Sequence, residues 1–140
     1  MYIVKKQRKI EEELCIQSAD GRDELKITVS LDVDDILANY NKARRELGKN
    51  QRAMEENPKS EEAMIALGAS IVHLFEIIFG EEDTKKILDC YENRYIEMLG
   101  DIAPFIAEVI QPQIEAAVRS REDKYRAIVD KRRKAAATHG

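Results

Sequence analysis

The residues of this chain that could carry out acid–base or metal chemistry gather in one stretch, HLFEIIFGEED at residues 73–83. His73 and Glu76 are three residues apart, so a helix would place both on one face, as an acid–base pair or half of a metal site. Glu81, Glu82 and Asp83 follow, and carboxylates are ligands for hard cations. A metal-dependent hydrolase using these residues is one hypothesis.

The rest of the sequence argues against catalysis. It contains no Gly-rich phosphate loop and no GxSxG, HExxH or CxxC motif. The other histidine, His139, is near the end of the sequence, where helices fray. Asp89 and Glu92 form an i, i+3 carboxylate pair, but no clear matching acidic motif is found on another helix. We therefore predict a protein that is not an enzyme and uses no metal or cofactor.

A helix-to-helix corner explains the same stretch more simply. The pattern predicts a helix that Asn57 caps, with Pro58 at its first position. Gly80 supplies the left-handed residue that ends this helix. The three acids then lie in the first turn of the next helix, where carboxylates meet the positive end of the helix dipole.

The helix before Gly80 is predicted to be the centre of the core. Ser70, His73 and Glu76 form a narrow polar stripe on it. The apolar remainder consists of Met64, Leu67, Ile71, Leu74, Phe75 and Ile78, with Ile65, Val72 and Phe79 on the flank. Spanning a bilayer requires about 20 predominantly apolar residues. Because polar residues interrupt this run, we predict a core helix and no membrane association.

The predicted fold is mainly α (α+β), in a single domain over residues 1–140. Residues 9–16 and 24–31 read as strands of a β-hairpin around a turn with Asp20 and Gly21, and residues 9–31 form this unit. About four helices follow. The helical body covers 32–111, with helices at 32–56, 81–99 and from 102 onward besides the central one, and Gly100 ends the third. Pro112 kinks or breaks the last helix, which continues as a charged C-terminal arm over 113–140.

Composition and charge are those of a helix-rich protein, with 44% hydrophobic and 36% charged residues and a net charge of −4. Cys15 and Cys90 are far apart in sequence, so we expect two buried, reduced thiols in a cytoplasmic protein. The N-terminal MYIVKKQRKIEEEL lacks the apolar segment of a secretory signal.

Positive charge is concentrated at the C-terminal end, whereas residues 32–101 carry an excess of acids. The basic arm is defined by Arg119, Arg121, Lys124, Arg126, Lys131, Arg132, Arg133 and Lys134. It could bind nucleic acid, an acidic partner or the body of another copy, or it could be a solvated helix end. A nucleic-acid-binding regulator is therefore the alternative function, although we consider nucleic acid the less favoured partner.

A partner helix would need an apolar groove between helices. The candidate groove residues are Phe75, Ile78, Phe79, Leu88, Tyr91 and Tyr95. An ordinary closed core explains each of them more simply, and it explains the spacing of Tyr91 and Tyr95 better than base stacking does. The edge of the hairpin is a candidate for self-association.

Three segments together carry a resemblance to a known family: SADGRDELKITV, IVHLFEIIFGEEDTKKIL and MLGDIAPFIAEVI, in that order. The chain resembles the tail assembly chaperones of long-tailed bacteriophages and related prophages. The resemblance covers most of the chain in architecture, through loose motifs. No residue-level binding motif of the family aligns with this sequence.

The resemblance implies a non-catalytic protein of virion morphogenesis in the host bacterial cytoplasm. Its partners would be the tape-measure protein, which the chaperone coats and keeps soluble, and the tail-tube protein, which it helps to recruit. A long client also implies a homo-oligomer.

Overall fold

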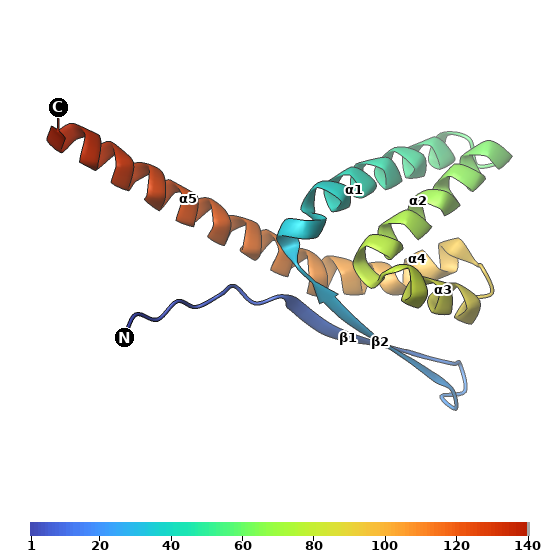
Figure 1. The fold of residues 1–140 in the computed structure, drawn as a ribbon. Coiled ribbons are helices and arrows are strands. Elements are labelled where there is room, and N and C mark those ends of the chain that lie inside the picture. Colours follow the sequence, from blue (N-terminus) through green and yellow to red (C-terminus); the bar gives the residue numbers. More distant parts are fainter. Residues whose placement is uncertain (140) are drawn as a thin grey trace.

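The computed structural model describes residues 1–139 and confirms the predicted fold class (Figure 1). An N-terminal two-stranded sheet precedes helices that pack around one core. The elements are β1 (Ile10–Gln17), β2 (Glu24–Leu31), α1 (Val33–Glu56), α2 (Glu61–Phe79), α3 (Glu81–Cys90), α4 (Tyr95–Phe105), the π-helical turn η1 (Ile106–Ile110) and α5 (Gln111–His139). Because α4, η1 and α5 follow one another without a break, the chain forms four helical rods.

The predicted hairpin is confirmed, and its register places Leu14 opposite Ile27 and Ile16 opposite Leu25. Strand β1 begins one residue later than predicted. Alternation turns one face of the sheet toward the helices, and Ile27 and Val29 are buried there. This contact with helices gives a two-stranded sheet the packing that it lacks alone in water.

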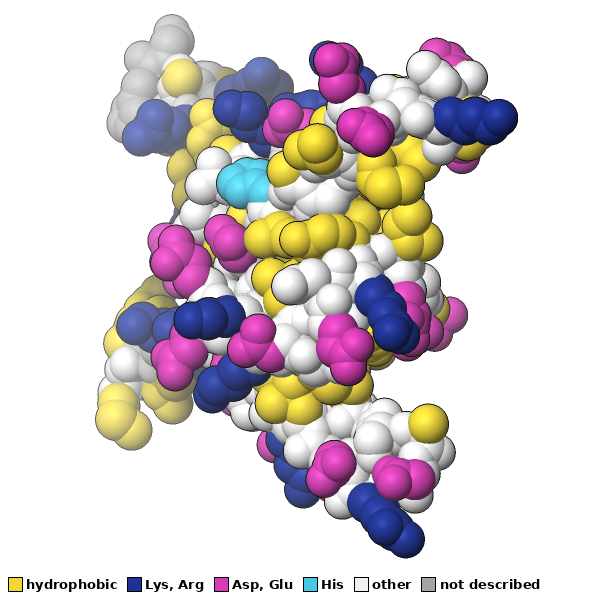
Figure 2. Space-filling view, turned by 90° about the vertical axis from the view of Figure 1, so that its right-hand side faces the viewer, with side chains coloured by type: hydrophobic (Ala, Val, Ile, Leu, Met, Phe, Trp, Pro, Cys, Tyr) yellow, Lys and Arg dark blue, Asp and Glu magenta, His cyan; other side chains and the backbone are white. Residues whose placement is uncertain are grey.

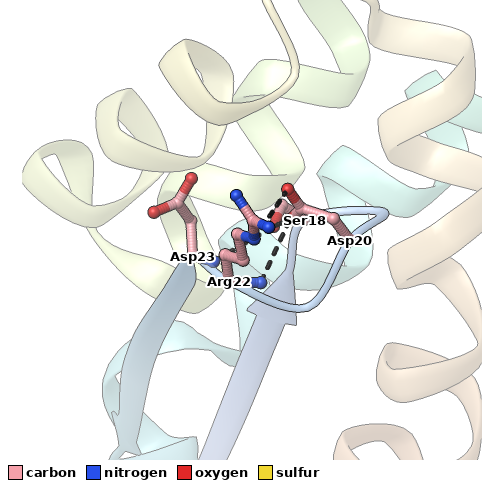
Figure 3. A network of polar contacts seen from close by, with 4 residues as sticks. All are labelled: Ser18, Asp20, Arg22 and Asp23. Carbon is pink, nitrogen blue, oxygen red and sulfur yellow. Dashed lines mark hydrogen bonds and ion pairs between the residues drawn. The ribbon is translucent and has the colours of Figure 1, made fainter.

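The hairpin turn is held by a network of short polar contacts (Figure 3). The hydroxyl of Ser18 donates to Asp20 Oδ1 at 2.6 Å, and the Arg22 amide donates to the same oxygen at 3.0 Å. These bonds stabilise the ionised carboxylate, so the pKa of Asp20 lies below its ordinary value, with the Ser18 bond as the larger cause. Gly21 takes the positive φ of 73° that the turn requires.

Helices α1 and α2 pack side by side along much of their length. Asp32 caps α1 by accepting the amide of Asp34, and Tyr40, Ala43 and Leu47 are buried on one face of the helix. Gly48 does not interrupt the helix. In its more polar second half, Asn50 donates to the carbonyl of Ala66 at 3.2 Å and to the Ser70 hydroxyl.

Helix α2 is the centre of the core, as predicted, but three details of the prediction were wrong. Ser60 is the N-cap and accepts the Ala63 amide at 3.1 Å, whereas Asn57 ends α1. Ser70 is buried and bonded to α1, so it belongs to a helix contact and not to a solvent stripe. Ile65 and its neighbour Met64 are exposed, because no element covers the first turns of α2 on that side.

The corner at Gly80 is confirmed, and the acids 81–83 open α3. The predicted helix 81–99 is wrong, because the chain breaks after Cys90. Glu92 and Asn93 take positive φ values of 53° and 61°, which no α-helix accommodates, and a new helix begins at Tyr95. Gly100 accordingly lies inside α4 and ends nothing.

Pro112 does not break the last rod. It follows the π-helical turn η1, where the Gln111 amide reaches back to the Ile106 carbonyl. Proline has no amide hydrogen to donate to the preceding turn, and the wider π turn absorbs this loss while the rod continues. Buried Ile106, Ile110 and Ile114 keep this region attached to the core.

The prediction of buried thiols was wrong for both cysteines, which are exposed. Cys15 lies between Leu14 and Ile16, and strand alternation turns it to the outer face of the sheet. Cys90 is the last residue of α3, at the start of the exposed loop.

Gly80 and Gly100 provide a test of the corner, because Gly80 has a positive φ and Gly100 lies inside a helix. Gly80 has φ 85° and ψ 163°, a region open almost only to glycine. We expect Gly80→Ala to lower the free energy of unfolding by about 1–3 kcal/mol. The control, Gly100→Ala, lies in a helix with open space at the Cβ position and should raise it by about 0.5–1 kcal/mol. Urea unfolding measures both, and equal effects would contradict this account of the corner.

Candidate functional site

The residues suggested for metal or acid–base chemistry do not converge. His73 is exposed on α2, and the acids of α3 lie beyond the corner, where Lys86 pairs with Glu82 and Asp83 at 3.9 Å. Asp89 and Glu92 do not share a helix face, because Glu92 lies in the loop. Within residues 1–139, no three His, Cys, Asp or Glu side chains are grouped to hold a metal ion. The side chain of His139 lies outside the described part.

Three of the six candidate groove residues belong to the closed core. Phe75 is fully buried, and Ile78 and Phe79 are nearly so. The Phe75 and Phe79 rings meet edge to face at 5.4 Å between centroids, and Phe79 stacks on Phe105 at 6.3 Å. These rings hold α2 to the last rod and present no surface to a partner.

The break at residues 91–94 separates Tyr95 from the other two candidates, Leu88 and Tyr91. Leu88 and Tyr91 are partly buried against the core, and Tyr95 begins α4 with 38% of its surface exposed. Of these three, Tyr95 lines an apolar groove beside α2, and Tyr91 lines a second hollow beside the hairpin.

That groove, here named the α2–α4 groove, runs along one face of α2 from Met64 to Glu76, beside the start of α4. It has a volume of about 760 Å³ and is lined by Met64, Ile65, Gly68, Ala69, Val72, His73, Glu76, Asn93 and Tyr95. Ile65 is 72% exposed, which is unusual for a branched aliphatic side chain in the middle of a folded chain. Figure 2 shows apolar side chains gathered on this face of the molecule, close to a histidine.

Gly68 sets the shape of the groove. A Cβ atom at this position would lie 3.2 Å from Cδ2 of Tyr95, closer than most side chains tolerate. The absence of a side chain lets the Tyr95 ring lie directly on the backbone of α2. The ring thereby forms one wall, with Met64 and Ile65 beyond it.

Met64 and Ile65 were assigned to the core from sequence, so their role in a surface groove was missed. The available signal was the apolar character of α2 around nearly its whole circumference. Covering such a helix takes neighbours along its full length, and α3 has only 10 residues against the 19 of α2. The excess apolar surface therefore stays open.

A second hollow, here named the hairpin cleft, lies between the end of the hairpin and the loop before α4. It has a volume of about 470 Å³, an apolar floor that includes Ile16, Leu25 and Tyr91, and five carboxylates: Asp23, Glu24, Glu92, Glu97 and Asp101. One guanidinium lies among them, since Arg94 pairs with Glu92 at 3.5 Å and with Glu97 at 3.7 Å. The cleft is thus strongly acidic.

Tyr91 and Asp101 meet at the floor of this cleft. The Tyr91 hydroxyl donates to Asp101 Oδ2 at 3.0 Å. Partial burial raises the pKa of Tyr91 most, and the bond to Asp101 and the charge of that carboxylate raise it further. The phenol therefore stays protonated and keeps donating well into the alkaline range.

The basic arm projects from the body (Figure 1). Its base is held by three contacts: Tyr40 bonds Gln111, Gln113 donates to Glu12 at 2.9 Å, and Arg121 pairs with Asp34 at 2.8 Å. Beyond Arg121 the arm leaves the core. Tyr125 is 67% exposed and Ile128 53% exposed, alongside the exposed cations of the arm.

Helix α2 is also the one described helix that is long and apolar enough to cross a membrane. The core helix of a folded domain has the same length and composition, and α2 is packed against α1, α3, α4 and β2. The finding therefore carries little weight.

The Tyr91–Asp101 pair predicts an alkaline signature. Because the folded-state pKa of Tyr91 is raised, its contribution to stability is full below the ordinary tyrosine pKa of 10.0 and is lost as pH rises beyond it. Asp101→Asn should lower the pKa of Tyr91. In a spectroscopic titration of the phenols, one tyrosine that titrates late in the wild type should therefore titrate at lower pH in this variant. Glu108→Gln, an exposed change in η1, is the control. An unchanged titration in Asp101→Asn would contradict the assignment.

No protein-family model, curated protein or solved structure matches this chain. Surfaces that could bind a partner are therefore inferred from the structure of this chain alone. That surface has three features: the apolar α2–α4 groove, the acidic hairpin cleft and the projecting basic arm.

Proposed function

We propose that this chain is a non-catalytic assembly chaperone that holds an amphipathic helix of its client in the α2–α4 groove. The observation that carries the proposal is the groove itself, an open apolar surface on an otherwise highly charged molecule. Contiguous exposed apolar surface of this kind marks interaction sites. The resemblance to tail assembly chaperones implies that the client is the tape-measure protein of a long-tailed phage, with the tail-tube protein as a second partner.

The groove suits a helix better than a small ligand. Its apolar side chains come from two helices, and an amphipathic helix can lay residues at i, i+3, i+4 and i+7 between such walls. Met64 adapts its shape to different clients, because its unbranched side chain has several rotatable bonds. His73 and Glu76 lie at the groove and can bond polar residues that flank the client's apolar face.

A chaperone must also remain soluble while it exposes this groove. The charged residues that make up 36% of the chain serve this purpose on the remaining faces. A client segment that covers Ile65, Met64 and Tyr95 would remove apolar surface from both proteins. Burial of two or three such side chains contributes about 1.5–3 kcal/mol each.

The test is co-expression with a tape-measure protein from the same genome. We expect the two proteins to co-purify and the client to become soluble. A double change, Met64→Ser with Ile65→Ser, should weaken the complex about tenfold or more, since it removes the apolar wall. Ile3→Ser changes an equally exposed isoleucine outside the groove and should have no effect.

Two outcomes would contradict the proposal. The client could stay insoluble and unbound beside the wild-type chain. Alternatively, the double variant could bind as well as the wild type does, which would place the client elsewhere. Circular dichroism of each variant separates a lost surface from a lost fold.

The exposed basic arm keeps a nucleic-acid-binding regulator as the alternative function. That function predicts binding to duplex DNA or RNA that weakens steeply with salt, because each phosphate contact releases counterions. It also predicts a shallower salt dependence when Arg126 and Lys131 are changed to Gln. Binding that is absent at low salt would exclude this alternative. Changes in the α2–α4 groove should leave any such binding intact.

A further inference from the structure

We propose that the arm of one copy docks in the hairpin cleft of a second copy, so that copies associate head to tail. This inference does not depend on the client, because neither surface belongs to the α2–α4 groove. It rests on the chemistry of the two surfaces and on their places in the fold.

The arm carries an uncovered apolar stripe. Tyr125 and Ile128 are three residues apart and share one helix face, and both are exposed. Lys124, Arg126 and Lys131 flank the stripe, and the cations of the arm outnumber the neighbouring acids Glu122, Asp123 and Asp130. Such a surface fits a partner with an apolar floor and a negative rim.

The hairpin cleft has this combination. Ile16, Leu25 and Tyr91 contribute apolar floor, and the rim carries five carboxylates against one guanidinium. Arg94 engages Glu92 and Glu97, whereas Asp23 lies at the hairpin end with no side-chain cation beside it among the described ion pairs. The cleft therefore retains uncompensated negative charge for incoming cations.

One copy cannot make this contact with itself. The arm and the hairpin turn lie at opposite ends of the molecule (Figure 1). Helix α5 is continuous from Gln111 to His139, so the arm does not fold back. Because the two joined surfaces differ, a dimer still presents one undocked arm at one end and one unoccupied cleft at the other, and chains of copies can grow.

A complementation experiment tests the contact in the intact chain. The arm variant carries Tyr125→Ser and Ile128→Ser, and the cleft variant carries Asp23→Lys and Glu24→Lys. All four positions are exposed, so the fold should persist, and circular dichroism checks this. Sedimentation velocity of the wild type should show mass that rises with concentration and falls at high salt.

Each variant alone should be monomeric, with association weakened about tenfold or more. An equimolar mixture should form a 1:1 dimer and nothing larger, since only the cleft of the arm variant and the arm of the cleft variant remain native. The proposal is overturned if the wild type is monomeric, if either variant still forms the larger assemblies, or if the mixture stays monomeric. An arm that binds duplex DNA while the protein stays monomeric would also overturn it.

The native Cys90 provides a positional test, because it is exposed and lines the cleft. In a Cys15→Ser background, Ala136→Cys lies on the face of Tyr125, three helical turns away, and Ala127→Cys lies on the opposite face. A bismaleimide with a spacer of about 16 Å, the length of three helical turns, should link Ala136→Cys to Cys90 of a second copy, and link Ala127→Cys far less. Equal linking, or linking that survives Cys90→Ser, would contradict the docking.

Discussion

The structure depends on the need of α2 to bury apolar side chains around most of its circumference. Phe75 and Ile71 are fully enclosed, and α1, β2, α3 and α4 all contact this one helix. The burial is large, since truncating a phenylalanine such as Phe75 to alanine costs about 3–5 kcal/mol. Cover is incomplete along the face of α2 that carries Met64, Ile65, Val72 and Glu76. The α2–α4 groove is the part of α2 that remains uncovered.

Two backbone features determine where α3 and α4 pack on α2. Gly80 turns the chain sharply enough for α3 to return along α2. The break at Glu92 and Asn93 then starts α4 where Tyr95 reaches the backbone at Gly68. A continuous helix through 91–94 would carry Tyr95 away from α2. The groove and the hairpin cleft thus both follow from one loop.

The sequence predicted the parts that rest on strong local signals. Strand alternation and the turn at Asp20 and Gly21 predicted the hairpin, and a glycine followed by three acids marked the corner at residue 80. The same alternation predicts that Cys15 faces outward, because its neighbours Leu14 and Ile16 face inward. Applying it consistently would have predicted an exposed thiol.

The failures arose where the deciding contact is distant in sequence. No glycine or proline marks the break at 92–93, and asparagine and glutamate also occur within helices. Asn57 and Ser60 are both good caps, so their order along the chain did not settle which one starts α2. Whether Met64 and Ile65 are covered depends on how far α3 and α4 extend over α2. Tertiary packing determines this extent, and the hydrophobic periodicity of the sequence does not predict it.

The most direct test of the central claim is site-specific photo-crosslinking in the complex co-expressed with the tape-measure protein. A photoreactive phenylalanine derivative at Ile65 should crosslink to the client, because this exposed side chain lines the groove. The same probe at Ile3 should not. Crosslinking from Ile3 or from the arm, with none from Ile65, would contradict the account and place the client on another surface.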